Sequence, residues 1–147
     1  MAPFVDSRWP DGLYRKIRVI FVAGRPYPLH LAIHDDWAVW YYNAEMGKHP
    51  ARRAEEARFL ADMENVIGIT ATRALYAIAR EIGLDYVGLD AGLMPDGRLV
   101  VFEVETGMLV HDPGSAPEVA ERRVAHGRIR GAVERMIDDR AAKRAAA

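Results

Sequence analysis

The stretch GLDAGLMPDGRLVVFEVET, residues 88–106, has the pattern of a β-hairpin. Two runs rich in Leu, Val and Phe are separated by Pro-Asp-Gly, which is typical of a tight turn between antiparallel strands. Three acidic residues, Asp90, Glu103 and Glu105, lie well inside these apolar runs. Acidic side chains in such positions need solvent or a partner, because carboxylates are almost never buried unpaired.

The turn predicts how the two strands pair. If the Asp-Gly pair at 96–97 forms a two-residue loop, Asp90 lies directly opposite Glu103, and Gly88 lies opposite Glu105. The same register predicts the pairs Pro95–Arg98, Met94–Leu99 and Ala91–Phe102. Because side chains alternate between the faces of a strand, the three carboxylates project from one face. Like charges this close are destabilising, so they need a proton, an arginine or a metal ion.

Mg²⁺ is the metal ion that this arrangement favours. It takes oxygen ligands from one or two carboxylates and leaves other positions to water and phosphate. Gly88 and Gly92 flank Asp90 on the same face, and we expect their missing side chains to leave room for a ligand. Two alternatives stay open. One is that the acids form an ordinary solvent-facing surface, and the other is that a one-residue slip in the turn changes the direct pairing.

The rest of the chain predicts a second hairpin and three helices. The expected strands cover 14–22 and 27–34, and the expected helices cover 50–63, 70–82 and about Glu118 to Arg140. Thr70 is the expected N-cap of the second helix and Gly83 its expected stop. An aromatic-rich extended piece is expected after the turn at 35–36. These elements indicate an α+β domain with an antiparallel or mixed sheet built from two hairpins.

The composition is that of an ordinary globular domain. The chain has 147 residues, of which 50% are hydrophobic and 28% charged, and this length suffices for a core. A net charge of −1 gives no indication of a nucleic-acid partner, and the lack of cysteine excludes disulfides and thiol catalysis. No run reaches the roughly 18 apolar residues of a membrane span or resembles a signal peptide, so we expect a soluble cytoplasmic protein.

Three segments together resemble the C-terminal half of an ATP-grasp domain. They are YRKIRVIFVAGRPYPLHLAI (14–33), RRAEEARFLAD (52–62) and GLDYVGLDAGLMPDGRLVVFEVETGML (83–109). The resemblance runs from about Phe4 to Asp112, and it is to bacterial ATP-grasp proteins that are related to carboxylate–amine ligases and often carry tetratricopeptide repeats. An Asp, a 13-residue step to Glu and then Glu-x-Asn form the magnesium signature of that family. Asp90 and Glu103 match its first two positions.

The resemblance implies a mechanism and a set of site residues. In that family ATP phosphorylates a carboxylate, and an amine or another nucleophile then displaces phosphate from the acyl phosphate. It implies that Glu103 bridges two Mg²⁺ ions, that Asp90 holds one, and that Arg18 binds a phosphate or acyl-phosphate oxygen. Arg18 has a second interpretation, an ion pair with one of the hairpin acids. Glu105 stands where the family has Asn, so it adds a third negative charge to the expected metal site.

The resemblance also divides the chain. We expect a single domain with a hinge-like lead-in at 1–13, a core at 14–112, and a C-terminal helix with a fraying tail at 113–147. The lead-in resembles the end of the hinge strand that passes the adenine, with Pro3 where that strand has an acid. The preceding lobe, which holds the nucleotide phosphates, is not represented. We therefore expect activity to need a second copy of the chain or a separate partner.

Other residues have plainer interpretations. His30 and His34 have metal-ligand spacing for a helix but lie in an expected strand, so a zinc site is disfavoured. The aromatic run at 37–42 either stacks a base or packs the sheet against a helix, and packing is favoured. His111 either touches a ligand or lies on the surface. Charged residues of the final helix are expected at the surface, while its apolar residues face the core or a partner chain.

Three functions stay open at this point. The first is an incomplete ATP-grasp unit that binds Mg²⁺ and ATP and needs a second chain for ligase activity. The second is a binding or regulatory module that keeps the fold without catalysis. The third is an α+β interaction domain with no nucleotide role. A missing lobe would leave apolar surface exposed, and Trp9, Trp37 and Trp40 are the residues expected there.

Overall fold

The computed structural model describes residues 4–116 and 119–146. In chain order the elements are β1 (Tyr14–Val22), β2 (Arg25–His34), the short 3₁₀ turn η1 (Met46–Lys48), α1 (Pro50–Ala61), α2 (Met63–Ile82), β3 (Tyr86–Leu93), β4 (Leu99–Glu105) and α3 (Ala120–Ala145). The strands form one sheet in the order β2-β1-β3-β4, and every neighbouring pair is antiparallel. The expected α+β class with two hairpins is therefore confirmed, and the sheet is antiparallel rather than mixed.

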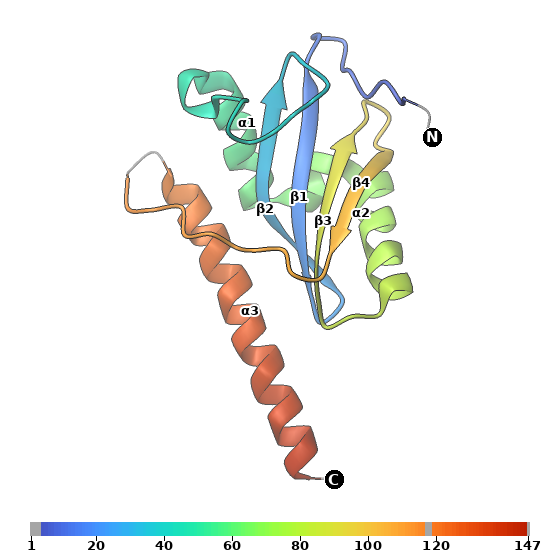
Figure 1. Ribbon diagram of the computed structural model, residues 1–147, viewed down its shortest axis with the longest axis vertical. Helices are drawn as coiled ribbons and strands as arrows, with labels where there is room; N and C mark the ends of the chain where they lie inside the picture. The colour runs from blue at the N-terminus through green and yellow to red at the C-terminus, as the bar shows by residue number, and fades with distance from the viewer. Residues whose placement is uncertain (1–3, 117–118, 147) are drawn as a thin grey trace.

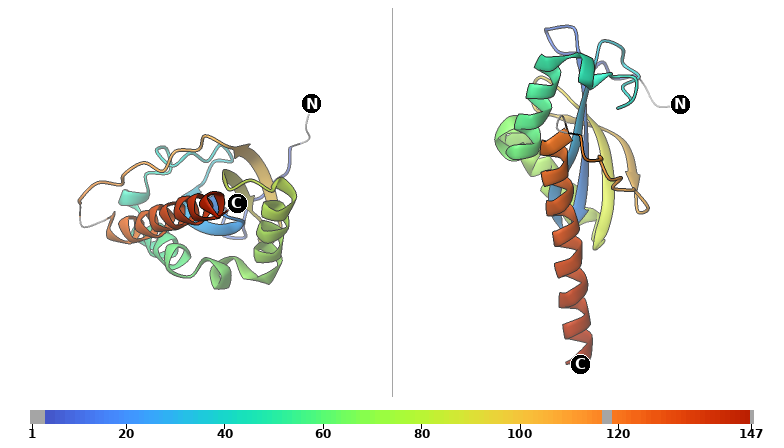
Figure 2. Two further views of the ribbon diagram at one scale, coloured as in Figure 1. Left: turned by 90° about the horizontal axis from the view of Figure 1, so that it is seen from below. Right: turned by 90° about the vertical axis from the view of Figure 1, so that its left-hand side faces the viewer.

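The helices are arranged around the sheet unequally. Helices α1 and α2 cover one face, while α3 runs along the β2 side and extends beyond the end of the sheet (Figures 1 and 2). Helix α3 packs against β2, α1 and β1. Much of the sheet face opposite α1 and α2 is therefore left to the polar residues of β1, β3 and β4.

Strand β1 explains this division, because its side chains alternate in character. Ile17, Val19 and Phe21 point into the main core beneath α1 and α2. On the other face, Ile20 and Val22 pack under α3 in a smaller apolar cluster. Burial of these side chains stabilises the fold by roughly 2 kcal/mol each. Lys16 and Arg18 occupy the remaining positions of that second face, beyond the reach of α3's apolar cluster.

Several expected boundaries are confirmed. The predicted bounds of the strand at 14–22 are correct at both ends, and the second strand begins two residues earlier than expected. Gly83 ends α2 in the left-handed conformation, at φ 63°, which glycine adopts without steric cost. The first helix ends at Ala61 rather than at residue 63.

Three expectations are wrong. Helix α2 begins at Met63 and is kinked at Gly68 (φ 78°, ψ 171°), so Thr70 lies inside it instead of capping it. Residues 35–45 form bends and turns and contain no extended aromatic strand. Helix α3 continues to Ala145, beyond its expected end near Arg140, and the expected fraying of the tail stays a prediction. Alanine has the highest helix propensity, and the two basic residues in the last turn interact favourably with the negative end of the helix dipole. The expected hinge position Pro3 and helix start Glu118 lie outside the described residues.

Candidate functional site

The hairpin pairs the acids as predicted. Asp90 lies opposite Glu103, and Gly88 lies opposite Glu105. The pairs nearer the turn differ from the prediction, because Ala91 faces Val101 and Leu93 faces Leu99. The side chains of the three acids nevertheless belong to one face of the sheet, the face that also carries Lys16 and Arg18.

Two one-residue shifts in the pairing of β3 with β4 cancel each other. Only the pairs far from the turn therefore match the predicted register. The turn has three residues, Pro95, Asp96 and Gly97, closed by a hydrogen bond of 2.9 Å from the Met94 N–H to the Arg98 carbonyl. Gly97 takes φ 80°, as the last residue of such a turn requires. A β-bulge then leaves Phe102 unpaired between Val101 and Glu103, and this extra residue restores the predicted register.

The space above the two flanking glycines is filled by the chain itself. A Cβ added to Gly88 would overlap the Met108 side chain, and one added to Gly92 would lie 2.8 Å from Phe102 Cζ. The expectation that these glycines leave room for a ligand is therefore wrong. They are glycines because Met108 and the bulged Phe102 pack directly on the strand, which a side chain would prevent.

Asp90 is buried and fully paired with cations. Its carboxylate accepts hydrogen bonds from Arg18 Nε (2.6 Å) and Nη2 (2.7 Å), and Lys16 Nζ lies 2.7 Å from Oδ2. Burial alone would raise the pKa of Asp90, but the hydrogen bonds from Arg18 and Lys16 outweigh it and hold that pKa below its usual value. The hydrogen bond to Asp90 in turn raises the pKa of Arg18. The ion-pair interpretation of Arg18 is therefore confirmed.

Glu103 and Glu105 are exposed neighbours of this ion pair. Their negative charges add to the rise in the pKa of Arg18, so both lie near its guanidinium. Three carboxylates and two cations give the group a net charge of −1, which suits a further cation. Within residues 4–116 and 119–146, however, no set of three or more acidic or histidine side chains is arranged to hold a metal ion. Glu103 and Glu105 are thus the accessible oxygen donors, whereas Asp90 is already engaged.

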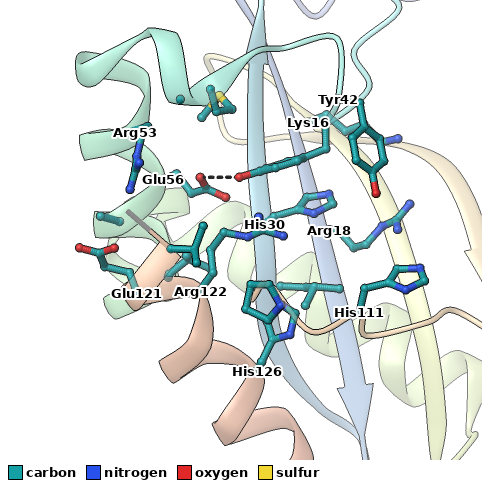
Figure 3. Close-up of a pocket in the computed structure, with 18 of the residues that line it drawn as sticks. Lys16, Arg18, His30, Tyr42, Arg53, Glu56, His111, Glu121, Arg122 and His126 are labelled. Carbon is teal, nitrogen blue, oxygen red and sulfur yellow. Dashed lines mark hydrogen bonds between the residues drawn. The ribbon is translucent and has the colours of Figure 1, made fainter. Parts of the chain in front are cut away.

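A pocket of about 740 Å³ adjoins Lys16 and Arg18. It extends across β1 and β2 to α1 and the first turns of α3, and residues 40–48 and 109–113 form its other walls. Figure 3 shows His30 near the middle, with Arg18 and His111 on one side and Arg122 on the other. A volume of this size is that of a small-molecule site. His111 lines the pocket, and its contact with a ligand stays a prediction.

Stacking and a hydrogen bond join three residues of the pocket lining, His30, Tyr41 and Glu56. His30 stacks on Tyr41, with ring centroids 4.6 Å apart. Burial, reinforced by the charge of Arg18, lowers the pKa of His30 to about 3, so its imidazole is neutral near pH 7. The Tyr41 hydroxyl donates a hydrogen bond of 3.0 Å to Glu56 Oε2. Burial raises the pKa of Glu56.

Arg122 and His126 enter the pocket from α3. The Arg122 guanidinium lies 4.5 Å from the Tyr41 ring centroid. Within the described part of the chain, Arg122 Nε and His126 Nε2 are buried without a hydrogen-bond partner. Sequence reasoning placed the charged residues of this helix at the surface and missed both. The available signal was their spacing of four residues, which puts them on one helix face with buried Ala125 and Ile129.

The aromatic run has a different environment from the one expected. Trp37 and Trp40 are exposed, at 63% and 61%, and Tyr42 is exposed as well, so packing against a helix is wrong for these three. Tyr41 does pack on the main core. Trp9 is half-buried, and its Nε1 donates a hydrogen bond of 2.7 Å to the Leu93 carbonyl. The expected exposed aromatic surface therefore contains Trp37 and Trp40 but not Trp9.

Comparison with protein-family models, curated proteins and solved structures finds no match to this chain. The resemblance to the ATP-grasp fold therefore stays a prediction from the sequence. None of the described helices is both long enough and apolar enough to cross a membrane.

Proposed function

We propose that this chain is a partial ATP-grasp unit that binds Mg²⁺ and ATP on the polar face of its sheet. The observation that carries the proposal is the joint placement of Lys16 and Arg18. These two cations lie between the exposed carboxylates of Glu103 and Glu105 on one side and a pocket of about 740 Å³ on the other. Cations beside accessible carboxylates are what a metal-bound polyphosphate requires.

Each residue has a role in this proposal. Glu103 and Glu105 would hold the metal ion, with Asp90 as a third candidate ligand. Arg18 and Lys16 would contact phosphate oxygens, and the metal ion would neutralise the remaining negative charge of the phosphates. Asp90 also positions Arg18, because its two oxygens hold Nε and Nη2 at 2.6 and 2.7 Å. Arg18 is then fixed before a ligand arrives, which lowers the entropic cost of binding.

The proposed reaction is that of ATP-dependent carboxylate–amine ligases. ATP would transfer its terminal phosphoryl group to a carboxylate and leave as ADP, and an amine would then displace phosphate from the acyl phosphate. Such chemistry needs groups on both sides of the nucleotide, so we propose that a second copy of the chain or a separate lobe completes the site. The exposed Trp37 and Trp40 support such an interface. A cytoplasmic location, where ATP is abundant, fits this proposal.

Calorimetry with Mg²⁺ and ATP tests the proposal directly. We expect binding that depends on Mg²⁺, and we expect Glu103→Gln to abolish that metal dependence. Glu134→Gln is the matched control, because Glu134 is an exposed acid on α3 outside the pocket. The absence of heat with ATP, ADP and Mg²⁺ at millimolar concentrations would reject the proposal for the chain alone. Unchanged metal dependence in Glu103→Gln would reject the hairpin as the metal site.

A second candidate is a nucleotide-binding module that has lost catalysis. The observation that favours it is the state of the acids: Asp90 is fully paired with Arg18 and Lys16, and Glu105 replaces the expected amide. Binding of ATP without release of ADP, in the presence of a second chain, would favour this candidate. Light scattering at about 100 μM tests the homodimer, and a monodisperse monomer would count against it.

A further inference from the structure

We propose that Arg122 and His126 form a recognition site for the carboxylate group of a small acid with an apolar body. The site lies at the α3 end of the pocket, away from Asp90, Glu103 and Glu105. Binding there needs neither Mg²⁺ nor a nucleotide, so the proposal goes beyond the proposed function and can be tested independently of it.

Arg122 differs from Arg15 and Arg18, the two arginines of β1. Arg15 is paired with Asp11 and Glu55 at 2.8 and 2.6 Å, and Arg18 is paired with Asp90 at 2.6 Å. Arg122 has no ion pair with any described residue, although it packs on the Tyr41 ring at 4.5 Å and its Nε is buried without a partner. A buried N–H of a cation is costly when it has no acceptor, and an anionic ligand in the pocket would remove that cost.

Glu56, an acid of the same pocket, does not pair with Arg122, because its oxygens accept other hydrogen bonds. Glu56 Oε2 accepts the Tyr41 hydroxyl at 3.0 Å, and Oε1 accepts the Leu31 N–H at 3.4 Å. The charge of Arg122 influences Glu56 through space and opposes the rise in its pKa, but the two side chains form no ion pair with an N···O distance of 4.0 Å or less. Glu56 instead holds Tyr41 in place as the platform on which the Arg122 guanidinium lies.

His126 supplies a second donor one helical turn further along α3. Its Nε2 is buried without a partner in the described part of the chain, and the side chain lines the same pocket. Figure 3 shows Arg122 and His126 reaching into the pocket from α3 on the side of His30. Burial, together with the charge of Arg122, lowers the pKa of His126. A neutral imidazole carries one N–H, so His126 can donate to an anion without adding charge.

The charge that Arg122 offers suits a monoanion. Among the other cations of the described lining, Lys16 and Arg18 already have Asp90 as a partner, and Lys48 has Glu45. Arg122 therefore offers one positive charge, which matches one carboxylate. The planar guanidinium of Arg122 also matches a carboxylate, which it can bind through two parallel hydrogen bonds.

The remaining walls suit an apolar body. The rings of Trp40 and Tyr42 and the side chain of Leu109 line the opening and are exposed, and Leu60 and Met46 lie deeper and are buried. Aromatic and aliphatic side chains that share a pocket with orienting polar groups are typical of small-molecule sites. A ligand with its carboxylate on Arg122 would place its apolar part against this lining.

The test uses 3-phenylpropionate as the acid and 3-phenylpropionamide as its neutral counterpart. Titrations are followed by calorimetry and by the arginine Nε–H signals in nitrogen-15 NMR spectra. We expect the acid to bind at least ten-fold more tightly than the amide and to shift the Arg122 Nε–H signal. We expect Arg122→Gln to weaken binding at least ten-fold and His126→Phe to weaken it about three-fold or more, as charged and neutral hydrogen bonds imply.

The controls separate this site from charge in general and from the nucleotide site. Arg130→Gln removes a matched, exposed arginine on α3 outside the pocket and should leave the affinity unchanged. Arg122→Lys keeps the charge, so it serves if Arg122→Gln does not fold, and it should lose part of the affinity. Arg122→Gln should leave the binding of Mg²⁺ and ATP intact, while Glu103→Gln should leave the binding of 3-phenylpropionate intact.

Four results would overturn the proposal. The first is no binding of 3-phenylpropionate at about 10 mM. The second is equal affinity for the acid and the amide. The third is an equal loss in Arg122→Gln and Arg130→Gln. The fourth is tighter binding of phenyl phosphate than of 3-phenylpropionate, which would replace the carboxylate by a phosphate as the ligand.

Discussion

Replacing Asp90 by asparagine tests what holds the polar face of the sheet together. Asparagine keeps the shape of the side chain but removes its charge, and its amide group can only donate where a carboxylate oxygen accepted. Arg18 would lose one of its two hydrogen bonds, at 2.6 or 2.7 Å, and Lys16 would lose its counter-charge at 2.7 Å. The variant therefore leaves two cations, which lie two residues apart on one face of β1, without an anion between them.

The structure sets the size of the effect. The side chain of Asp90 is 1% exposed, whereas those of Lys16 and Arg18 are 16% and 24% exposed. Removing one partner of a buried ion pair costs about 3–5 kcal/mol. Because both cations keep some access to solvent, we expect the lower end, about 3 kcal/mol. In a domain of this size that loss lowers the melting temperature by roughly 10 °C.

Urea unfolding at pH 7, followed by tryptophan fluorescence, measures this loss. Asp96→Asn is the matched control, because Asp96 pairs with Arg98 at an exposed turn, where an ion pair contributes little. The lowered pKa of Asp90 means that its contribution is complete above about pH 4 and is lost as the pH falls through the folded-state pKa. The difference between variant and wild type should therefore shrink in acid. A loss below about 1 kcal/mol at pH 7 would refute the reasoning.

The same experiment with Mg²⁺ separates two roles of Asp90. If the carboxylate only positions Arg18, Mg²⁺ at about 10 mM should change the stability of wild type and variant equally. If Asp90 is a metal ligand, as the ATP-grasp resemblance implies, Mg²⁺ should stabilise the wild type selectively, by an amount set by its concentration relative to the dissociation constant.

Three further substitutions test other parts of the structure. The pKa of His30 is about 3 in the folded state and about 6.5 in the unfolded state. Lowering the pH from 6.5 to 5 should therefore destabilise the wild type by about 2 kcal/mol. His30→Gln should remove this pH dependence of the unfolding free energy, as measured by urea unfolding. Gly88→Ala should cost about 2 kcal/mol through overlap with Met108, and adding Met108→Ala should relieve it, as thermal unfolding would reveal. Gly83→Ala at φ 63° should cost about 1 kcal/mol in the same assay, and no loss would refute its left-handed conformation.

Sequence patterns predicted correctly those strands and helices whose bounds depend mainly on neighbouring residues in the chain. Strand β1 was predicted at both ends because β-branched residues fill it and a turn follows. The pair Asp90–Glu103 was predicted from a wrong turn length, and it agrees only because the bulge at Phe102 offsets the three-residue turn. The bulge depends on how Phe102 packs over Gly92. That contact joins two strands and has no signature within either one.

The site was predictable only where its residues follow the alternation of a single strand or hairpin. The acids and Arg18 could be found from strand alternation, but which of the two interpretations of Arg18 holds depends on the register between β1 and β3, which sequence alone leaves open. Arg122 and His126 were missed for a related reason. Their environment is created by Tyr41, about 80 residues earlier in the chain, so a helix with mixed charges had to be interpreted as surface.

The ion pair and the phosphate contact proposed for Arg18 do not exclude each other. The guanidinium presents Nε and Nη2 to Asp90, and these two groups form one edge of its planar fork. Nη1 has no hydrogen-bond partner in residues 4–116 and 119–146, and Arg18 lines the pocket. Because Asp90 binds one edge of the Arg18 guanidinium, the other edge can donate hydrogen bonds to an anion from a fixed position. Lys16 has no such second edge, because its charge is a single point beside Oδ2 of Asp90. Arg18 therefore connects the buried acid to the pocket, and a ligand could bind there without breaking the ion pair that stabilises the sheet.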